Sequence, residues 1–306
     1  MKRRDVMLKK NNYQPCSLHK RVAASVEDFA PLPSVAMKVL GMVADPDTTS
    51  TEIELVLKGD ISLVVSVLKL ANPAFYGLRR QVVSLGHALL LLGRNEVQGL
   101  LLSRVMFQAF KVSEGQQKDI MAGVWKHSLE CALAAEYLSE KYDADMGVCF
   151  LGGMLHDVGK LVIVQQFSAE VKDLEKYGQL TEEDGVEAEI RLLGCSHNDL
   201  GSQLLHRWMF PAVLVEMVQS HHSYEEIAEY DRPRQVLIVA NILSRLVAAK
   251  DHDEIEEDEL EVLTTLLLRC GADSGIISDE NSLIELEAGF RQRLAERQGL
   301  IELLEM

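Results

Sequence analysis

The sequence predicts an all-α protein, a two-lobed helical bundle, and two observations support this fold class. Apolar residues recur at helical spacing along most of the chain, whereas the alternation of apolar and polar residues that marks a β-strand is nowhere sustained. The predicted helices are short and many are apolar on more than one side, which is typical of a compact bundle. The polar segment 111–118, which contains Gly115, is the best candidate for a boundary between the lobes.

Composition and charge limit the classes of function. The chain has 306 residues, of which 47% are hydrophobic and 25% are charged, as in an ordinary globular protein. A net charge of -16 argues against a nucleic-acid partner, which would need a basic face, and against docking on an anionic membrane. Neither partner is therefore expected.

Cysteine usage and targeting signals predict the compartment. The five cysteines are scattered and contain no Cys-x-x-Cys pair, so we expect buried thiols in a reducing compartment. The basic N-terminus lacks the apolar core of a signal peptide. No segment reaches the ~20 apolar residues that a membrane span needs. We expect a cytoplasmic protein.

Capping and turn residues divide the predicted helices of the first third. Residues 1–19 are polar and are expected to form a loose arm. The first helix follows Pro31-Leu32-Pro33 and ends before Pro46, because a proline disfavours helical geometry in the residue before it. Ser50 or Thr51 is expected to cap the second helix. Three more are predicted: from Asp60 or Ser62 to Asn72, from the cap Ser84 to Gly93, and from there to about Phe110.

The rest of the chain also reads as helices. They are expected at residues 117–142, 146–156, 161–167, 197–208, 211–221 and 233–249, with a charged segment at 171–193. Residues 251–261 hold eight carboxylates in eleven positions but lack the glycine of a calcium loop, so a solvated helix start or linker is expected. The segment after Asn281 is an amphipathic helical tail, which either caps the domain or pairs with a partner.

A polar pair interrupts the most apolar part of the chain. His156 and Asp157 follow an apolar helical run that contains Gly152 and Gly153, small residues that allow another helix or a bound ion to come close. Burying Asp157 is costly without a cation, which a metal, Lys160 or a protonated histidine would supply.

Four more histidines fall at inward-facing or terminal positions of predicted helices: His127, His197, His221 and His222. For any one of them, a hydrogen-bonded place in the core is a sufficient explanation. Taken together with His156 and Asp157, they form a ligand set that suits zinc, iron, manganese or nickel. Their wide spacing differs from a His-Glu-x-x-His protease site and requires a bundle in which several helices each deliver one ligand.

At this point the chain resembles the HDOD domain, a relative of the HD and HD-GYP phosphohydrolases, over about residues 20–250. The matching segments are Leu32-Pro33-Ser34-Val35-Ala36, Asp45-Pro46, Leu70-Ala71-Asn72-Pro73-Ala74-Phe75-Tyr76-Gly77, Val83-Ser84-Leu85-Gly86-His87-Ala88, Leu92-Gly93, Trp125-Lys126-His127-Ser128, the run from Gly152 to Lys160, His197 with Gly201, Trp208, Pro211 and His221-His222.

The resemblance implies an organisation. Residues 20–112 would form an N-terminal helical lobe and residues 113–250 an HD-like lobe, which together make the HDOD domain. Residues 251–306 would be an acidic linker and the helical tail. It also implies a bacterial signalling or regulatory protein, because HDOD proteins are generally regarded as such modules.

The resemblance further implies a ligand set. In HD phosphohydrolases a first histidine, the His-Asp pair and a later aspartate bind metal, and His127, His156 and Asp157 match the first three. The later aspartate aligns with Asn241, whose neutral amide is a weaker ligand. His197, His221 and His222 match histidines that serve a second metal in the HD-GYP group. That group's metal-binding glutamate corresponds to Gly123, and its Gly-Tyr-Pro signature is missing.

Two functions remain open from the sequence. The first is a non-catalytic regulatory protein that binds signalling proteins or a signal ligand, with a homodimer left open and with either a divalent metal or no cofactor. The second is a metal-dependent phosphohydrolase or phosphodiesterase. In that enzyme Asp157 and Lys160 would be catalytic, Asp157 by holding the metal and Lys160 by offsetting phosphoryl charge.

Overall fold

The computed structural model describes residues 116–167, 182–251 and 257–298 and part of the chain before them. In that earlier part it describes residues 48–58 and 84–93 and positions 26, 27, 29, 42, 64, 65, 67, 68, 71, 82, 97 and 110. Every regular element in these described residues is a helix, which confirms the predicted all-α class.

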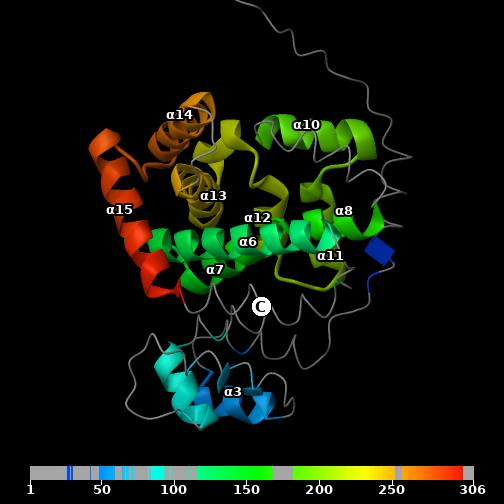
Figure 1. Cartoon of the computed structure of the whole chain (residues 1–306), viewed down its shortest axis with the longest axis vertical. Helices are drawn as coiled ribbons and strands as arrows, with labels where there is room; N and C mark the ends of the chain where they lie inside the picture. Colours follow the sequence, from blue (N-terminus) through cyan, green and yellow to red (C-terminus); the bar gives the residue numbers. More distant parts are fainter. Residues whose placement is uncertain are drawn as a thin grey trace, which may run out of the picture.

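The larger body is a bundle around the long helix α6 (Figure 1). Its helices are α6 (Gln116–Lys141), α7 (Met146–Leu155), α8 (Val158–Gln166), α10 (Glu182–Leu193), α11 (His197–Arg207), α12 (Ala212–Ser220), the 3-10 helix η2 (Tyr224–Glu229), α13 (Arg232–Asp251), α14 (Glu257–Ser274) and α15 (Glu280–Glu296). The apolar core lies where α6, α7 and α13 pack together, and α11 packs on α8 and α12.

Local capping fixes where the helices near the polar pair begin. Asp145 caps α7, because its Oδ1 accepts a hydrogen bond of 2.8 Å from the backbone N–H of Val148. Ser196 and Asp199 form a capping box at the start of α11. That box makes His197 the first residue of its helix and so directs the helix N-terminus toward α8.

Glycines let the helix backbones approach closely. A Cβ atom at Gly153 of α7 would overlap the backbone of Ala132 on α6. A Cβ atom at Gly159 of α8 would overlap the carbonyl oxygen of His197 on α11. These close approaches carry residues 156 and 157 into the middle of the bundle.

The N-terminal part lies apart from the centre of the bundle (Figure 1). It contains α3 (Ser50–Leu57) and helical residues 85–93, which end at Gly93 in the left-handed conformation (φ 77°). Ser84 precedes this second helix as predicted, and its Oγ accepts a bond of 3.4 Å from the N–H of His87.

The predicted cap of α3 was wrong by one residue. Thr49, rather than Ser50 or Thr51, caps the helix: its Oγ1 accepts from the N–H of Glu52, and the Glu52 carboxylate accepts from the N–H of Thr49. This reciprocal capping box satisfies two backbone donors, which a cap at Ser50 or Thr51 would not do. The predicted helices after Pro33 and from Asp60 to Asn72 lie largely outside the described residues.

A row of aromatic rings joins this part to the bundle. Phe29 lies 5.0 Å from Phe110, and Phe110 lies 6.2 Å from Trp208, which caps α11 (ring centroids). Arg207 adds a hydrogen bond of 3.1 Å to the carbonyl oxygen of Glu27. The end of α11 is therefore attached to residues of the N-terminal part.

The chain after residue 250 continues the bundle. Of the acidic run 251–261, α13 ends at Asp251 and α14 begins at Glu257, so the run includes a helix start as expected. The amphipathic tail contains α15, which packs on α6: Phe290 is buried, and Arg293 bonds to Glu136 at 3.2 Å. Within the described residues this helix thus caps its own bundle.

The structure corrects two further expectations. The segment 171–193, which was predicted only as charged, contains the helix α10, whose many charged residues obscured the helical spacing of its apolar residues. The stretch Met146–Gln166 is long and apolar enough to cross a membrane, contrary to the expectation that no segment is, but 83% of the window is buried inside the bundle, as in a core helix. The predicted buried thiols are confirmed for Cys131, Cys149, Cys195 and Cys270.

The Gly153 contact predicts a measurable difference between two glycines. We expect Gly153→Ala to lower the free energy of unfolding by about 1–3 kcal/mol, because the methyl group overpacks the α6–α7 contact. The control is Gly123→Ala on the exposed face of α6, where the new Cβ meets no atom within 4 Å outside its own stretch of helix. It should raise the free energy of unfolding by up to about 1 kcal/mol. Denaturant unfolding of both variants measures this, and equal effects would contradict the packing described.

Candidate metal centre

All seven residues predicted as metal ligands lie around one point in the bundle. His127 comes from α6, and His156 and Asp157 from the junction of α7 and α8. His197 opens α11, His221 and His222 follow α12, and Asn241 lies in α13. Their ligand atoms form two groups that share Asp157: position 1 with His127 and His156, and position 2 with His197, His221 and His222.

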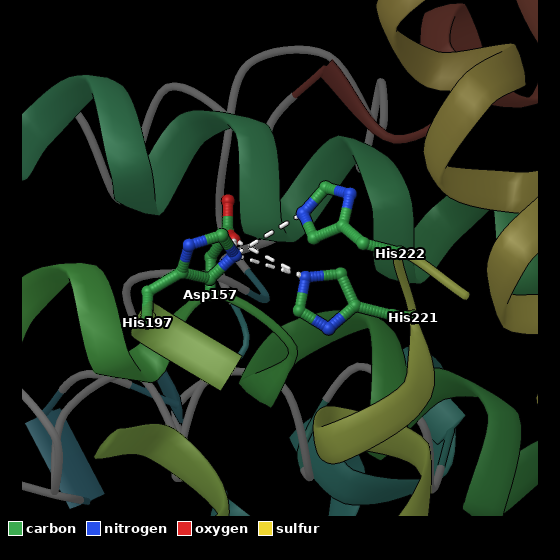
Figure 2. A group of neighbouring side chains, drawn as sticks. All are labelled: Asp157, His197, His221 and His222. Atoms are coloured by element: carbon green, nitrogen blue, oxygen red, sulfur yellow. Dashed lines mark hydrogen bonds and ion pairs between the residues drawn. The ribbon is translucent and has the colours of Figure 1, made fainter. Parts of the chain in front are cut away.

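Position 2 is the richer group (Figure 2). The Oδ1 atom of Asp157 lies 3.4 Å from Nε2 of His197 and 3.7 Å from Nε2 of His221. The Nε2 atom of His197 lies 3.2 Å from that of His221 and 3.1 Å from that of His222. Four donor atoms from three separate segments thus face one small volume.

Contacts on the far side of the rings set which nitrogen faces that volume. Nδ1 of His221 lies 2.7 Å from the carbonyl oxygen of Val218, and Nδ1 of His197 lies 2.7 Å from Oε2 of Glu189. Because these oxygens only accept hydrogen bonds, each Nδ1 carries the proton and each Nε2 of a neutral ring presents a lone pair. Two such lone pairs at 3.2 Å repel each other unless a cation lies between them.

Asp157 gives an independent test of this arrangement. Its side chain is 1% exposed, and its Oδ1 has no hydrogen-bond donor within the described part of the chain. A buried carboxylate oxygen without a donor is costly. The oxygen faces the inward nitrogens of position 2, so the donor set fits a divalent metal ion there.

Position 1 has a different composition. Nε2 of His156 lies 3.2 Å from Nε2 of His127 and 3.3 Å from Oδ2 of Asp157. That Oδ2 already accepts a bond of 2.8 Å from Nζ of Lys160. Oδ1 of Asn241 lies 3.0 Å from Nε2 of His127, and its buried Nδ2 has no partner among the described residues. Among the described residues of this group, the only anionic side chain is the shared carboxylate of Asp157.

Comparison with known proteins identifies the family. The family model of the HDOD domain matches residues 29–224, almost two thirds of the chain. The chain belongs to the HDOD domain family. This confirms the family that the sequence motifs indicated and the bundle expected from it.

Curated relatives of this HDOD chain are distant. An uncharacterized protein of Treponema pallidum is 23% identical over 224 residues, which are 72% of this chain and 42% of that protein. Ribonuclease Y of Thermotoga petrophila is 28% identical over 131 residues, which are 43% of this chain and 19% of that enzyme. The HDOD chain therefore spans less than half the length of these relatives.

Solved structures agree on the fold. A Shewanella amazonensis protein named as a candidate phosphohydrolase superposes with a TM-score of 0.68 at 23% identity, covering 94% of this chain and 98% of that one. A Geobacter sulfurreducens HDOD domain protein with unknown function superposes with a TM-score of 0.63 at 22% identity, covering 90% and 99%. At these identities the likeness shows the fold alone.

The electrostatics of the HDOD site separate its two positions. Burial opposes the charge of Asp157, but His156 and Lys160 outweigh it and hold the pKa of Asp157 well below its usual value. Burial likewise opposes a charged His156, yet Asp157 raises the pKa of His156 well above the usual range. Burial and the neighbouring His222 lower the pKa of His221 well below the usual value for histidine. A neutral His221 is ready to bind metal, whereas His156 holds a proton that a metal would have to displace.

Sequence reasoning missed two residues of the site. Glu189 bonds to His197, and the hydroxyl of Tyr224 lies 2.8 Å from Nδ1 of His222. Glu189 stands among several glutamates of α10, and its spacing from His197 carries no recognised signal. Gly123, the position of the HD-GYP glutamate, is exposed on α6.

The neutral state of His221 predicts a pH effect on the metal-free protein. As pH falls below about 6.5, the unfolded chain takes up a proton at residue 221 and the folded chain does not, so stability falls by at most about 1.4 kcal/mol per pH unit. His156, with its raised pKa, is already protonated in the folded state, whereas the unfolded chain is only partly protonated at residue 156 near pH 6.5, and this difference opposes the slope. The opposition fades toward pH 5.5 and is equal in both proteins compared. Denaturant unfolding in chelator between pH 6.5 and 5.5 should show a steeper loss for the native sequence than for His221→Asn. Parallel losses would mean that His221 is not held neutral.

Proposed function

We propose that this HDOD protein is a metal-binding regulatory module that binds one divalent transition-metal ion at position 2. The observation that carries the proposal is the buried Oδ1 atom of Asp157, which has no hydrogen-bond donor within the described residues and faces three inward histidine nitrogens. Three imidazoles and a carboxylate suit zinc, iron, manganese or nickel.

The two positions differ in the charge that they offer a metal. Asp157 presents Oδ1 to position 2, while its Oδ2 at position 1 is paired with Lys160. Asn241 contributes a neutral oxygen where HD phosphohydrolases carry an aspartate, and affinity for a divalent ion falls as ligand charge falls. Position 1 is therefore the weaker of the two.

The weaker ligand set at position 1 favours a regulatory role over a catalytic one. Two-metal hydrolysis needs both ions to stabilise the attacking and leaving oxygens of a displacement. The ligands that bind the metal in HD phosphohydrolases correspond to position 1. In this chain position 1 lacks the second carboxylate of that ligand set. A single ion at position 2 would hold α8, α11 and the end of α12 in one arrangement.

The proposal extends to partners and compartment. We expect a cytoplasmic protein that binds other signalling proteins, or a second copy of itself, through its helical surface. The acidic net charge of -16 supports neither a nucleic-acid nor a membrane partner. The HDOD domain would act by binding these partner proteins, since no set of catalytic residues other than the histidine site is evident in the sequence.

A second candidate, a metal-dependent phosphohydrolase, rests on a specific observation. The side chains of His127 and Lys160 are 21% and 29% exposed, so the position 1 side of the site has an accessible edge. A bound divalent ion would activate water and offset phosphoryl charge there. Lys160 would contribute a second positive charge toward a phosphate group.

Metal binding to the purified protein tests the main proposal. We expect about one equivalent of Zn²⁺ or Co²⁺ per chain, and we expect His197→Ala to weaken its affinity by more than about 100-fold, beyond the usual cost of losing an outer-shell partner. The control is His206→Ala, an exposed histidine near the other end of α11, which should leave affinity unchanged. Metal titration with a competing chelator measures both. A native protein that binds no metal would refute the proposal.

The substitution Asn241→Asp tests the weakness of position 1. It adds a carboxylate beside His127, so we expect a second equivalent of Mn²⁺ or Fe²⁺ to bind at least about 10-fold more tightly than to the native chain. Titration gives the stoichiometry, and hydrolysis of a generic phosphodiester with added Mn²⁺ gives the activity. Turnover by the native protein that is lost in His156→Ala would support the phosphohydrolase instead.

A further inference from the structure

A buried carboxylate outside the ligand set contacts position 2. Glu189, on α10, is 8% exposed, and its Oε2 lies 2.7 Å from Nδ1 of His197. The same oxygen accepts a second bond of 2.8 Å from the backbone N–H of His197. Nearby on the same helix, the side chain of Glu187 is 75% exposed. Glu189 is thus directed inward while its neighbour faces solvent.

The two bonds from Glu189 act on one ligand in two ways. The bond to the backbone satisfies an N–H of the first turn of α11, which has no partner within the helix. The bond to Nδ1 fixes the ring plane and keeps the proton on Nδ1, which leaves the lone pair on Nε2 directed at Oδ1 of Asp157. A hydrogen bond to an anionic acceptor is also stronger than one to a carbonyl oxygen, so it holds the ring more firmly.

The histidines of the site differ in this respect. Nδ1 of His221 contacts the carbonyl oxygen of Val218, and Nδ1 of His156 contacts that of Gly153. Among the hydrogen bonds described at Nδ1 of the site histidines, only that of His197 goes to a carboxylate. The Nε2 atom of His197 also lies close to both other histidine nitrogens of position 2, at 3.1 Å from His222 and 3.2 Å from His221.

We propose that Glu189 is a positioning residue that strengthens metal binding at position 2 by orienting His197 and keeping its proton on Nδ1, so that Nε2 is free to bind the metal. This inference rests on the proposed function, because it presupposes a metal at position 2. It assigns α10, which supplies no ligand to the site, a part in the affinity of the centre.

The test is a titration of Co²⁺ into the full chain with a competing chelator. Glu189→Gln keeps the size of the side chain and an accepting oxygen but removes the charge, and we expect it to weaken Co²⁺ binding about 10- to 100-fold. Glu187→Gln is the matched control on the same helix and should bind as the native protein does. The visible absorption of bound Co²⁺ should shift in Glu189→Gln and not in Glu187→Gln, because only Glu189 is hydrogen-bonded to a ligand, His197.

A double-mutant cycle separates positioning from a merely structural role. In a His197→Ala background, Glu189→Gln should change Co²⁺ affinity by less than about 3-fold, because the histidine through which it acts is gone. The same loss in both backgrounds would overturn the proposal.

If Glu189→Gln does not fold, Glu189→Asp replaces it. The side chain that carries the carboxylate is then one carbon shorter, and native affinity in that variant would contradict the role. A native chain that binds no Co²⁺ fails the proposed function, whereas native-like binding by a folded Glu189→Gln fails this inference alone.

Discussion

The buried carboxylate of Asp157 constrains the arrangement of the whole HD-like bundle. It is 1% exposed at the junction of two apolar helices, where an unpaired charge would cost far more than the burial of nearby apolar side chains returns. Lys160 compensates one oxygen, and the adjacent His156 and the histidines of three other segments surround the rest. Those segments reach it because Gly153 and Gly159 let α6 and α11 approach at backbone distance. The packing of small residues and the polar centre are therefore one feature of the fold.

The two oxygens of that carboxylate divide the site into unequal halves. Oδ2 has a fixed ammonium partner, while Oδ1 has no hydrogen-bond donor in the described chain and faces three imidazoles. Replacing the expected carboxylate by Asn241 keeps an oxygen beside His127 but removes its charge. An amide in place of a carboxylate lowers the attraction for an ion at position 1. Under the proposed function, such a centre would bind one metal ion for structure more readily than two for hydrolysis.

The sequence was sufficient for the parts of this protein that local chemistry determines. Apolar periodicity located α6, α7, α11, α12 and α13 closely. The positions of the histidines on the predicted helices, with the His156-Asp157 pair, indicated six of the converging residues, and the family resemblance added Asn241. Sequence reasoning failed where several residues carry the same local signal. Thr49, Ser50 and Thr51 are all good caps, and only the reach of Glu52 selects the first. Glu189 differs from Glu187 solely in its direction after the chain folds, because the helical face that α10 buries depends on contacts distant in sequence.

The helix α11 connects the metal centre to the N-terminal part of the protein as a single rigid element. It begins at His197, a member of position 2, and its cap at the other end is Trp208, about 17 Å away at 1.5 Å per residue. Trp208 packs against Phe110, which packs against Phe29, and Arg207 bonds to Glu27. A helix of this length does not bend easily between its ends, so a displacement of His197 that moves the helix also moves the aromatic contact. Glu189 holds the first end of that element, as a metal bound at position 2 would, and the aromatic rings of the N-terminal part hold the second.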